Sequence, residues 1–464
     1  MSLQYEYDLL ILGAGPGGYV AAIRASQLGM KAGIIERDKP GGVCLNVGCI
    51  PSKALIHQAE IFRAVSPLEE LGLQVNRDGF DYAKVYAKSR EAANTLSRGV
   101  EYLLRKNKVD LIKGYGRITG NHEISLQNGR RITGKKLLIA TGSSPREIPG
   151  FPFDEERILS STGALMLQSL PARMLILGGG AIGIEFAHIF NSFGVEIHIV
   201  EMLDGIRPSE DRETVHILEK ALKERGIRIS TETKALSVES GKDHMEIRLE
   251  EKNGDRYSVE ADMILVAVGR VPNTQDIGLE NVGITTEKGF IPVGDYYQTS
   301  VSSIFAIGDV VNSPLLAHVA SKEGEIAVEY MAGLEPEKRI DPDLIPKAVY
   351  CEPQLASFGY TEKRAVQENM PYEKAVFPYR GVGKAVAVGR PEGLVKVLYH
   401  PASREILGAH VVGMEATELI HELLLAKSAE LLPEDIATMI HAHPSLSEAV
   451  METMRMAEGW AIHI

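Results

Sequence analysis

A strand, a glycine-rich turn, a helix and a second strand occur twice in this 464-residue chain, at residues 8–36 and again at residues 173–201. The turn glycines are Gly13, Gly15 and Gly18 in the first copy and Gly178, Gly180 and Gly183 in the second. Glycines at this spacing allow a tight turn and the close approach of a pyrophosphate to the helix N-terminus. Each copy closes on a glutamate, Glu36 or Glu201, which can accept hydrogen bonds from an adenosine ribose. Two such copies predict two bound dinucleotides and two Rossmann-like α/β domains.

Two cysteines, Cys44 and Cys49, lie five positions apart just after the first copy. The chain has only three cysteines, so a zinc site built from four of them is excluded. A disulfide across so short a loop also stabilises a fold little. Pro51 suits the first position of a helix, which puts Cys49 at a helix N-terminus beside Lys53, where a thiolate is favoured. The pair therefore predicts a redox-active disulfide beside a bound cofactor.

The position of the cysteines along the chain assigns the two cofactors. Because the pair must contact the redox ring and belongs to the first unit, we expect that unit to bind the flavin, FAD. The second unit then binds the nicotinamide cofactor. Glu201 would repel a 2′-phosphate, and no arginine occupies the adjacent Met202 or Leu203, so the sequence favours NAD over NADP.

A histidine and a glutamate near the C-terminus form a weaker pattern, with His443 five residues before Glu448. A carboxylate so placed can fix the tautomer of the histidine and raise its basicity. On the pattern alone, a helix-capping His-Pro-Ser with a solvated glutamate is an equally good interpretation. Thiol–disulfide exchange needs a base, and this favours the interpretation of His443 and Glu448 as a catalytic pair.

The length of the chain exceeds what one hydrophobic core usually organises. We expect an α/β body with a C-terminal α+β domain, preceded by a polar linker with three prolines. The expected divisions are the first part of the FAD-binding domain at 1–147, the NAD-binding domain at 148–273, the second, central part of the FAD-binding domain at 274–345, and the interface (dimerisation) domain at 346–464.

Charge and hydropathy exclude several classes of partner. A formal net charge of −12 without a basic cluster argues against nucleic acid. No uninterrupted apolar run approaches the roughly 18 residues that cross a bilayer, and the N-terminus lacks the positively charged start of a signal peptide. Three cysteines in such a chain indicate a reducing compartment, and we expect a cytoplasmic protein.

Together these motifs resemble the flavin-dependent pyridine nucleotide–disulfide oxidoreductases over essentially the whole chain. The most specific matches are residues 41–53, 178–185, 306–310, 316–318 and 441–448. Within the family, the resemblance implies oxidation of dihydrolipoamide to lipoamide through a Cys44–Cys49 disulfide and FAD, with reduction of NAD⁺. It also implies that Asp309 holds the flavin ribityl chain and that Lys53 pairs with Glu185 near the reactive nitrogen of the flavin.

The site residues expected on this basis fall into three groups. The catalytic group is Cys44, Cys49, His443, Glu448, Lys53 and Glu185. The expected FAD contacts are Gly13, Gly15, Gly18, Glu36, Lys53, Gly116, Thr141, Gly142, Asp309, Ala317 and His318. The expected NAD contacts are Gly178, Gly180, Gly183, Glu201 and Gly269. No metal site is expected.

The family resemblance also implies partners. It implies a homodimer in which His443 and Glu448 act on the cysteines of the other subunit. It further implies association with a lipoyl-bearing domain and the core subunit of a 2-oxo-acid dehydrogenase or glycine-cleavage complex. Two alternatives stay open: another NAD(P)H-dependent disulfide reductase of the family, or a chain that serves mainly as an assembly subunit.

Three residues depart from the family pattern or fall outside it. Val43 replaces the usual threonine, which removes a hydroxyl near the flavin, and Ser445 replaces the threonine after His-Pro. Cys351 falls where no disulfide partner is expected, and we interpret it as a small core residue. Neither replacement removes a group that the thiol chemistry needs.

Overall fold

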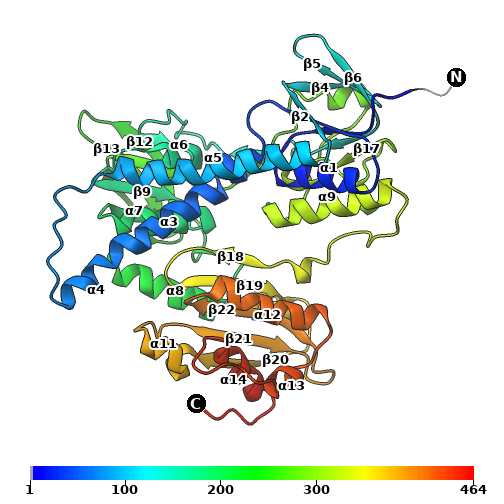
Figure 1. The fold of residues 1–464 in the computed structure, drawn as a ribbon. Coiled ribbons are helices and arrows are strands. Elements are labelled where there is room, and N and C mark those ends of the chain that lie inside the picture. Colours follow the sequence, from blue (N-terminus) through cyan, green and yellow to red (C-terminus); the bar gives the residue numbers. More distant parts are fainter. Residues whose placement is uncertain (1–3, 464) are drawn as a thin grey trace.

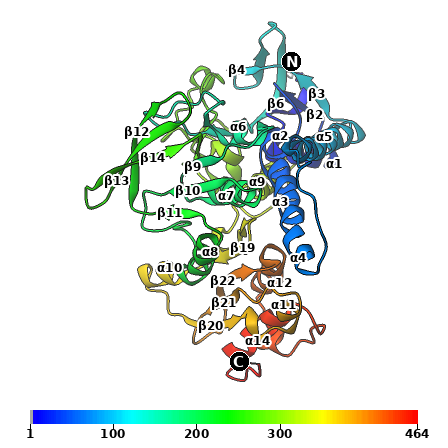
Figure 2. The same ribbon diagram turned by 90° about the vertical axis from the view of Figure 1, so that its left-hand side faces the viewer.

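The computed structural model describes residues 4–463. The first three residues, which belong to the N-terminus examined for a signal peptide, and residue 464 lie outside the described residues. Two α/β units lie side by side above a C-terminal domain (Figure 1), and the view from the side shows the same arrangement (Figure 2). Among the described residues, no helix is both long enough and apolar enough to cross a membrane.

The first unit is built on a sheet that unites both ends of the predicted FAD-binding domain. Its strands are β1 (Tyr7–Leu12), β2 (Ala32–Glu36), β3 (Asp110–Lys113), β4 (Gly116–Gly120), β5 (Glu123–Leu126), β6 (Arg131–Ile139) and β17 (Ile304–Ala306). Strands β3, β2, β1, β6 and β17 run parallel in that order, and β5 and β4 continue from β6 as an antiparallel extension. The apolar run of β1 is almost wholly buried, as expected for a parallel strand covered on both faces.

Helices cover this sheet and reach toward the second unit. They are α1 (Pro16–Gln27), α2 (Gly42–Val47), α3 (Cys49–Arg63), α4 (Val65–Glu70), α5 (Tyr82–Lys106) and α9 (Ala317–Met331). Helix α9 packs directly on α1, although about 300 residues separate them, because Gly17 and Gly324 face each other without side chains. Between Cys49 and Lys106 the chain forms three of these helices, and Pro67 lies inside α4.

The second unit repeats the plan of the first. Its elements are β8 (Ile158–Leu159), α6 (Ser161–Met166), β9 (Arg173–Leu177), α7 (Ala181–Ser192), β10 (Glu196–Val200), α8 (Arg212–Glu224), β11 (Arg228–Ser230) and β15 (Met263–Val266). These strands form a parallel sheet in the order β11-β10-β9-β15-β8. An antiparallel sheet of β12 (Thr233–Ser240), β13 (Met245–Glu251) and β14 (Arg256–Ala261) packs beside it.

A two-stranded ribbon of β7 (Ser143–Pro145) and β16 (Arg270–Pro272) joins the two units. Short 3₁₀ helices complete the central region and the linker: η1 (Leu279–Val282), η2 (Asp295–Tyr297), η3 (Gly308–Val310) and η4 (Pro342–Leu344). Since the chain changes sheets at the ribbon and again after η4, we propose to keep the predicted divisions at 147, 273 and 345.

The C-terminal domain contains one antiparallel sheet in the order β18-β19-β22-β21-β20. Its elements are β18 (Lys347–Val349), β19 (Gln354–Gly359), α10 (Glu362–Gln367), β20 (Glu373–Pro378), η5 (Tyr379–Gly381), α11 (Gly383–Ala387), β21 (Leu394–Tyr399), β22 (Ile406–Gly413), α12 (Ala416–Ser428), α13 (Pro433–Ala437) and α14 (Glu448–Ala457). Strands β21 and β22 are buried along their whole length, although they contain Lys396 and His410.

Candidate functional site

The glycine-rich turn of the first unit leaves open space at the start of α1. Gly13 has a φ of 105°, and a Cβ there would overlap the carbonyl oxygen of Ala140. A Cβ on Gly18 would overlap the carbonyl oxygen of Gly13, so the third glycine is what lets α1 pack on the turn. A Cβ on Gly15 would meet nothing within 4 Å. Gly15 thus lies beside a vacant space in front of a helix N-terminus, where a pyrophosphate fits.

The second unit reproduces this geometry at the start of α7. Gly178 has a φ of 109° and lies against the carbonyl oxygen of Ala267, while Gly183 lies against that of Gly178. Around Gly180 there is again nothing within 4 Å of a Cβ. The same steric pattern at both turns makes each turn fit a dinucleotide.

The two glutamates that close the second strands are oriented alike. Glu36 accepts hydrogen bonds from the backbone N–H groups of Ala14 (2.7 Å) and Asp38 (2.8 Å). Glu201 accepts them from Gly179 (2.7 Å) and Leu203 (2.9 Å). Each carboxylate is fixed beside the open end of its helix and keeps lone pairs free for ribose hydroxyls.

The two thiols lie together between the first unit and the second. Cys44 is half-buried on α2, and Cys49, which is exposed, is the first residue of α3. Pro51 is therefore the third residue of α3. The sequence had predicted it as the first residue of the helix. Both thiols are free in this structure.

The Cys44 thiol donates a hydrogen bond to Cys49, and this bond separates their acidities. Together with Lys53, it lowers the pKa of Cys49 to about 7, although burial opposes the shift. The same hydrogen bond, with burial, raises the pKa of Cys44. Cys49 is thus the thiolate of the pair and Cys44 its proton donor.

The expected pairing of Lys53 with Glu185 is present and links the two units. The Lys53 ammonium donates to both carboxylate oxygens of Glu185 on α7, at 2.9 and 2.8 Å. A third residue, Tyr350, joins them: its backbone N–H donates to Glu185 at 3.1 Å, and its ring lies 4.5 Å from the Lys53 Nζ. Sequence reasoning missed Tyr350, because nothing local connects it with residues 165 and more positions away.

Several expected FAD contacts gather around the ribbon that joins the units. Asp309, in η3, accepts a hydrogen bond from the Ser143 hydroxyl and lies 3.9 Å from Arg270. Thr141 donates to the carbonyl oxygen of Asn273 at 2.7 Å, so its hydroxyl helps to hold the two units together. Gly142 and Gly269 have φ values of 70° and 112°, which glycine tolerates best.

The other expected FAD contacts lie elsewhere in the first unit. Ala317 and His318 begin α9, and the His318 Nε2 lies 2.9 Å from the Pro346 carbonyl oxygen. Burial lowers the pKa of His318. Gly116 is buried in β4, where a Cβ would press on the side chains of Leu12 and Ile124, so core packing already explains this glycine.

His443 and Glu448 form the expected pair, with the His443 Nδ1 2.8 Å from a carboxylate oxygen. The second oxygen accepts from the backbone N–H of Ser445 at 2.9 Å. Burial raises the pKa of Glu448, but these two partners outweigh it and the net shift is downward. The imidazole is exposed. His443 lies in the loop between α13 and α14. Figure 2 shows α14 at the bottom of the molecule, well below α2, so this pair and the thiols of one chain are apart.

Two further histidines of the C-terminal domain each lie beside a glutamate. His441, whose side chain is only 3% exposed, lies 2.8 Å from Glu422 on α12. His463 lies 3.2 Å from Glu452 on α14. These partners are 19 and 11 residues away, beyond the range of a local motif.

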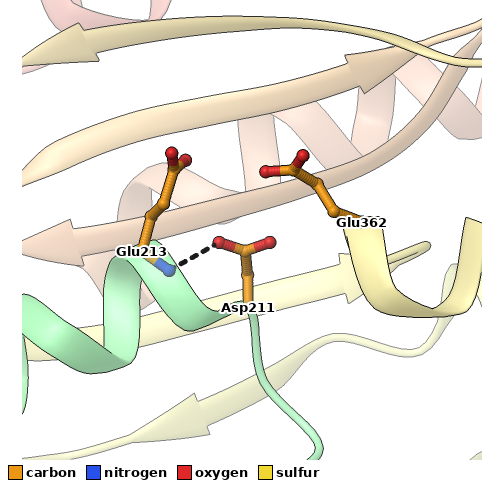
Figure 3. Close-up of side chains that lie close together, drawn as sticks. All are labelled: Asp211, Glu213 and Glu362. Atoms are coloured by element: carbon orange, nitrogen blue, oxygen red, sulfur yellow. Dashed lines mark hydrogen bonds between the residues drawn. The ribbon is translucent and has the colours of Figure 1, made fainter. Parts of the chain in front are cut away.

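Three carboxylates, those of Asp211, Glu213 and Glu362, converge where α8 meets the C-terminal domain (Figure 3). The backbone N–H of Glu213 donates to Asp211 at 3.0 Å. The three surround the ammonium of Lys396, which is fully buried and lies 2.9 Å from Asp211 and 2.7 Å from Glu213. A lysine thus supplies the positive charge that the carboxylates need, and the cluster gives no reason to infer a metal ion.

Comparison with known proteins identifies the family. Residues 7–324 match the pyridine nucleotide-disulphide oxidoreductase family, and residues 345–454 match its dimerisation domain. The chain belongs to the pyridine nucleotide-disulphide oxidoreductase family. Two relatives are both named dihydrolipoyl dehydrogenase. That of Bacillus subtilis (strain 168) is 41% identical and covers 99% of both chains. That of Geobacillus stearothermophilus is 42% identical and covers 99% of this chain and 98% of its own.

Solved structures of this family share the fold at lower identity. LpdA from Mycobacterium tuberculosis superposes with a TM-score of 0.89 at 26% identity, over 97% of this chain and 99% of its own. The HOCl-induced flavoprotein disulfide reductase RclA from Escherichia coli superposes at 0.86 with 25% identity, over 97% and 100%. Family membership confirms the predicted fold class, the disulfide chemistry and the use of FAD and NAD. The dimerisation domain supports the predicted homodimer.

Proposed function

We propose that this chain is a dihydrolipoamide-oxidising, NAD⁺-reducing enzyme. The observation that carries the proposal is the Cys44–Cys49 pair, with one thiol activated at a helix start beside Lys53, in a chain about 40% identical over its full length to dihydrolipoyl dehydrogenases. When bound, FAD supplies the two-electron carrier between this thiol pair and NAD⁺. Glu36 and Glu201 would bind the two adenosine riboses.

The chain's own residues account for the thiol steps. His443 of the partner subunit accepts the proton of one dihydrolipoamide thiol, and the resulting thiolate attacks Cys44 in the oxidised pair. The Cys44–Cys49 bond breaks, and Cys49 leaves as a thiolate that Lys53 stabilises. The second substrate thiol then attacks the mixed disulfide and closes the lipoamide ring. The departing Cys44 sulfur takes up the proton of that second thiol, and the first proton leaves His443 for solvent.

The finer partners follow from the same proposal. The substrate is a lipoyl group on a mobile domain of a 2-oxo-acid dehydrogenase or glycine-cleavage complex, and the dimer binds the core subunit of that complex. The exposed His443 suits a base that must meet a substrate from another protein. A cytoplasmic location, to which the cysteine usage points, stays a prediction.

The test is NADH formation from free dihydrolipoamide by the purified FAD-loaded dimer. We expect steady turnover with NAD⁺ and much slower turnover with NADP⁺. In Glu201→Ala the difference between the two turnover rates should be smaller. Cys44→Ser is the matched inactive control. Reduction of glutathione disulfide in preference to lipoamide would favour another reductase of the family. A folded, FAD-loaded dimer that is inactive alone but binds a core subunit would favour the assembly role.

A further inference from the structure

Tyr350 lies where the three domains of the chain meet. It directly follows β18, the first strand of the C-terminal domain, and is half-buried. Lys53 belongs to α3 of the first unit and Glu185 to α7 of the second. Tyr350 contacts both, so residues from three separate stretches of chain surround one ammonium group.

Two groups contact the Lys53 ammonium. The Glu185 carboxylate accepts two hydrogen bonds from it, at 2.8 and 2.9 Å. The ring of Tyr350 lies 4.5 Å from Nζ, within the range of attraction between a cation and an aromatic face. The Tyr350 backbone N–H meanwhile fixes one oxygen of Glu185. A carboxylate alone would let the ammonium rotate around it, and the ring removes that freedom.

The position of this ammonium matters for Cys49. The positive charge of Lys53 lowers the pKa of Cys49, whereas the negative charge of Glu185 raises it. The balance depends on which of the two charges lies nearer the sulfur, and therefore on where Nζ is held. Burial raises the pKa of Tyr350 itself, so its hydroxyl stays neutral near neutral pH.

We propose that Tyr350 is a positioning residue: its ring and its backbone N–H hold the Lys53–Glu185 pair so that the ammonium stabilises the Cys49 thiolate. The inference rests on the thiol chemistry of the proposed function but not on the identity of the dithiol substrate. It also gives the C-terminal domain a role at the thiol pair of its own subunit, separate from that of His443.

The experiment measures the thiolate directly. In a Cys44→Ser background, the rate at which iodoacetamide alkylates Cys49 in the FAD-loaded dimer is followed against pH, with Cys44→Ser/Cys49→Ser as the blank. Tyr350→Leu keeps the backbone N–H but loses the ring. It should raise the midpoint pH of the Cys49 alkylation curve, so that alkylation below pH 7 slows by about three- to tenfold. Tyr350→Phe keeps the ring and should match the parent.

A double-mutant cycle then asks whether Tyr350 acts through Lys53. In a Lys53→Met background, Tyr350→Leu should cause no further shift. A shift that persists there, or an equal shift in Tyr350→Phe, would overturn the proposal. If Tyr350→Leu does not fold, increasingly fluorinated phenylalanines at position 350 keep the shape of the ring while weakening its negative face, and should raise the midpoint stepwise. An unchanged midpoint across that series would overturn the proposal as well. No dithiol substrate is used, so the result is independent of the activity assay.

Discussion

Cys49 combines exposure with a lowered pKa, which suits a thiolate that must face a flavin. Because the pKa is lowered to about 7, the thiolate forms as the pH rises through that value. In the FAD-loaded protein we expect Cys44→Ser to show a long-wavelength charge-transfer band without added reductant, which grows as the pH is raised from about 5 to about 9. Cys49→Ser should lack the band. Visible absorbance spectra across this range check the prediction, and spectra reversed between the two variants would reverse the roles.

Glu448 orients His443 through a carboxylate whose two oxygens have different donors. A glutamine can offer only one acceptor, so either His443 or the Ser445 N–H loses its partner. We therefore expect Glu448→Gln to lower kcat by at least about tenfold, toward the range for removing a general base. The KM for NAD⁺ should stay unchanged. Glu422→Gln, which alters the neighbouring His441 pair, is the matched control, and an equal loss there would point to a disturbed loop.

At the level of single residues, the sequence predicts groups whose chemistry is local. The Cys44–Cys49 spacing and the His443–Glu448 spacing each fall within one turn or loop, and both pairs are in contact. The Tyr350 contact and the His441–Glu422 pair were not predictable, because each depends on how separate elements pack. Only the resemblance to a family connected Lys53 with Glu185, which lies 132 residues away.

The glycine-rich turns show how one element can serve two purposes. A methyl group on Gly180 would enter the open space at the start of α7, whereas one on Gly183 would collide with the turn itself. Gly180→Ala should therefore raise the KM for NAD⁺ while leaving the melting temperature unchanged. Gly183→Ala should lower the melting temperature. Steady-state kinetics and thermal unfolding separate the two effects, and equal melting temperatures would show that the turn relaxes.

At the level of elements, the regular pattern of the α/β units made them predictable. The strand, turn, helix and strand expected at residues 8–36 and 173–201 agree with β1, α1 and β2 and with β9, α7 and β10. The six-residue α2, which carries Cys44, is too short to show a helical period, and it was missed. In the C-terminal domain, β18 and β20 have only three and six residues, and buried apolar positions alternate along β20 only in its second half.

For the whole molecule, the proposed role of His443 depends on a second subunit, because His443 is apart from the thiols of its own chain. We expect heterodimers of His443→Gln and Cys44→Ser chains to recover activity, because one of the two sites then has both an intact histidine and an intact thiol pair. A symmetric dimer predicts about half of the wild-type turnover. The measurement is NADH formation by tagged, purified heterodimers. Inactive heterodimers would place the histidine in the same subunit as the thiols it serves.

The buried Lys396 has a consequence for how the molecule unfolds. It ties Asp211 of the second unit to Glu362 of the C-terminal domain. Burial alone would raise the pKa of Glu362, but Lys396 and Lys374 lower it to about 2. The ionised Glu362 therefore stabilises the folded protein fully above the pKa of a glutamate in the unfolded chain, roughly 4.3. This stabilisation is lost as the pH falls toward 2. Replacing Lys396 leaves its carboxylates without a counter-charge, which lowers the free energy of unfolding by about 3–5 kcal/mol.

Calorimetry should therefore record the second unit and the C-terminal domain melting in one cooperative transition near neutral pH. Lys396→Met should split this transition into two or shift it to lower temperature, and acid should do the same to the wild type. Lys374→Met, which alters a more exposed partner of Glu362, is the milder control. Separate transitions already present in the wild type at neutral pH would contradict the prediction. If the prediction holds, the second unit and the C-terminal domain are lost together on heating, while the first unit can unfold separately.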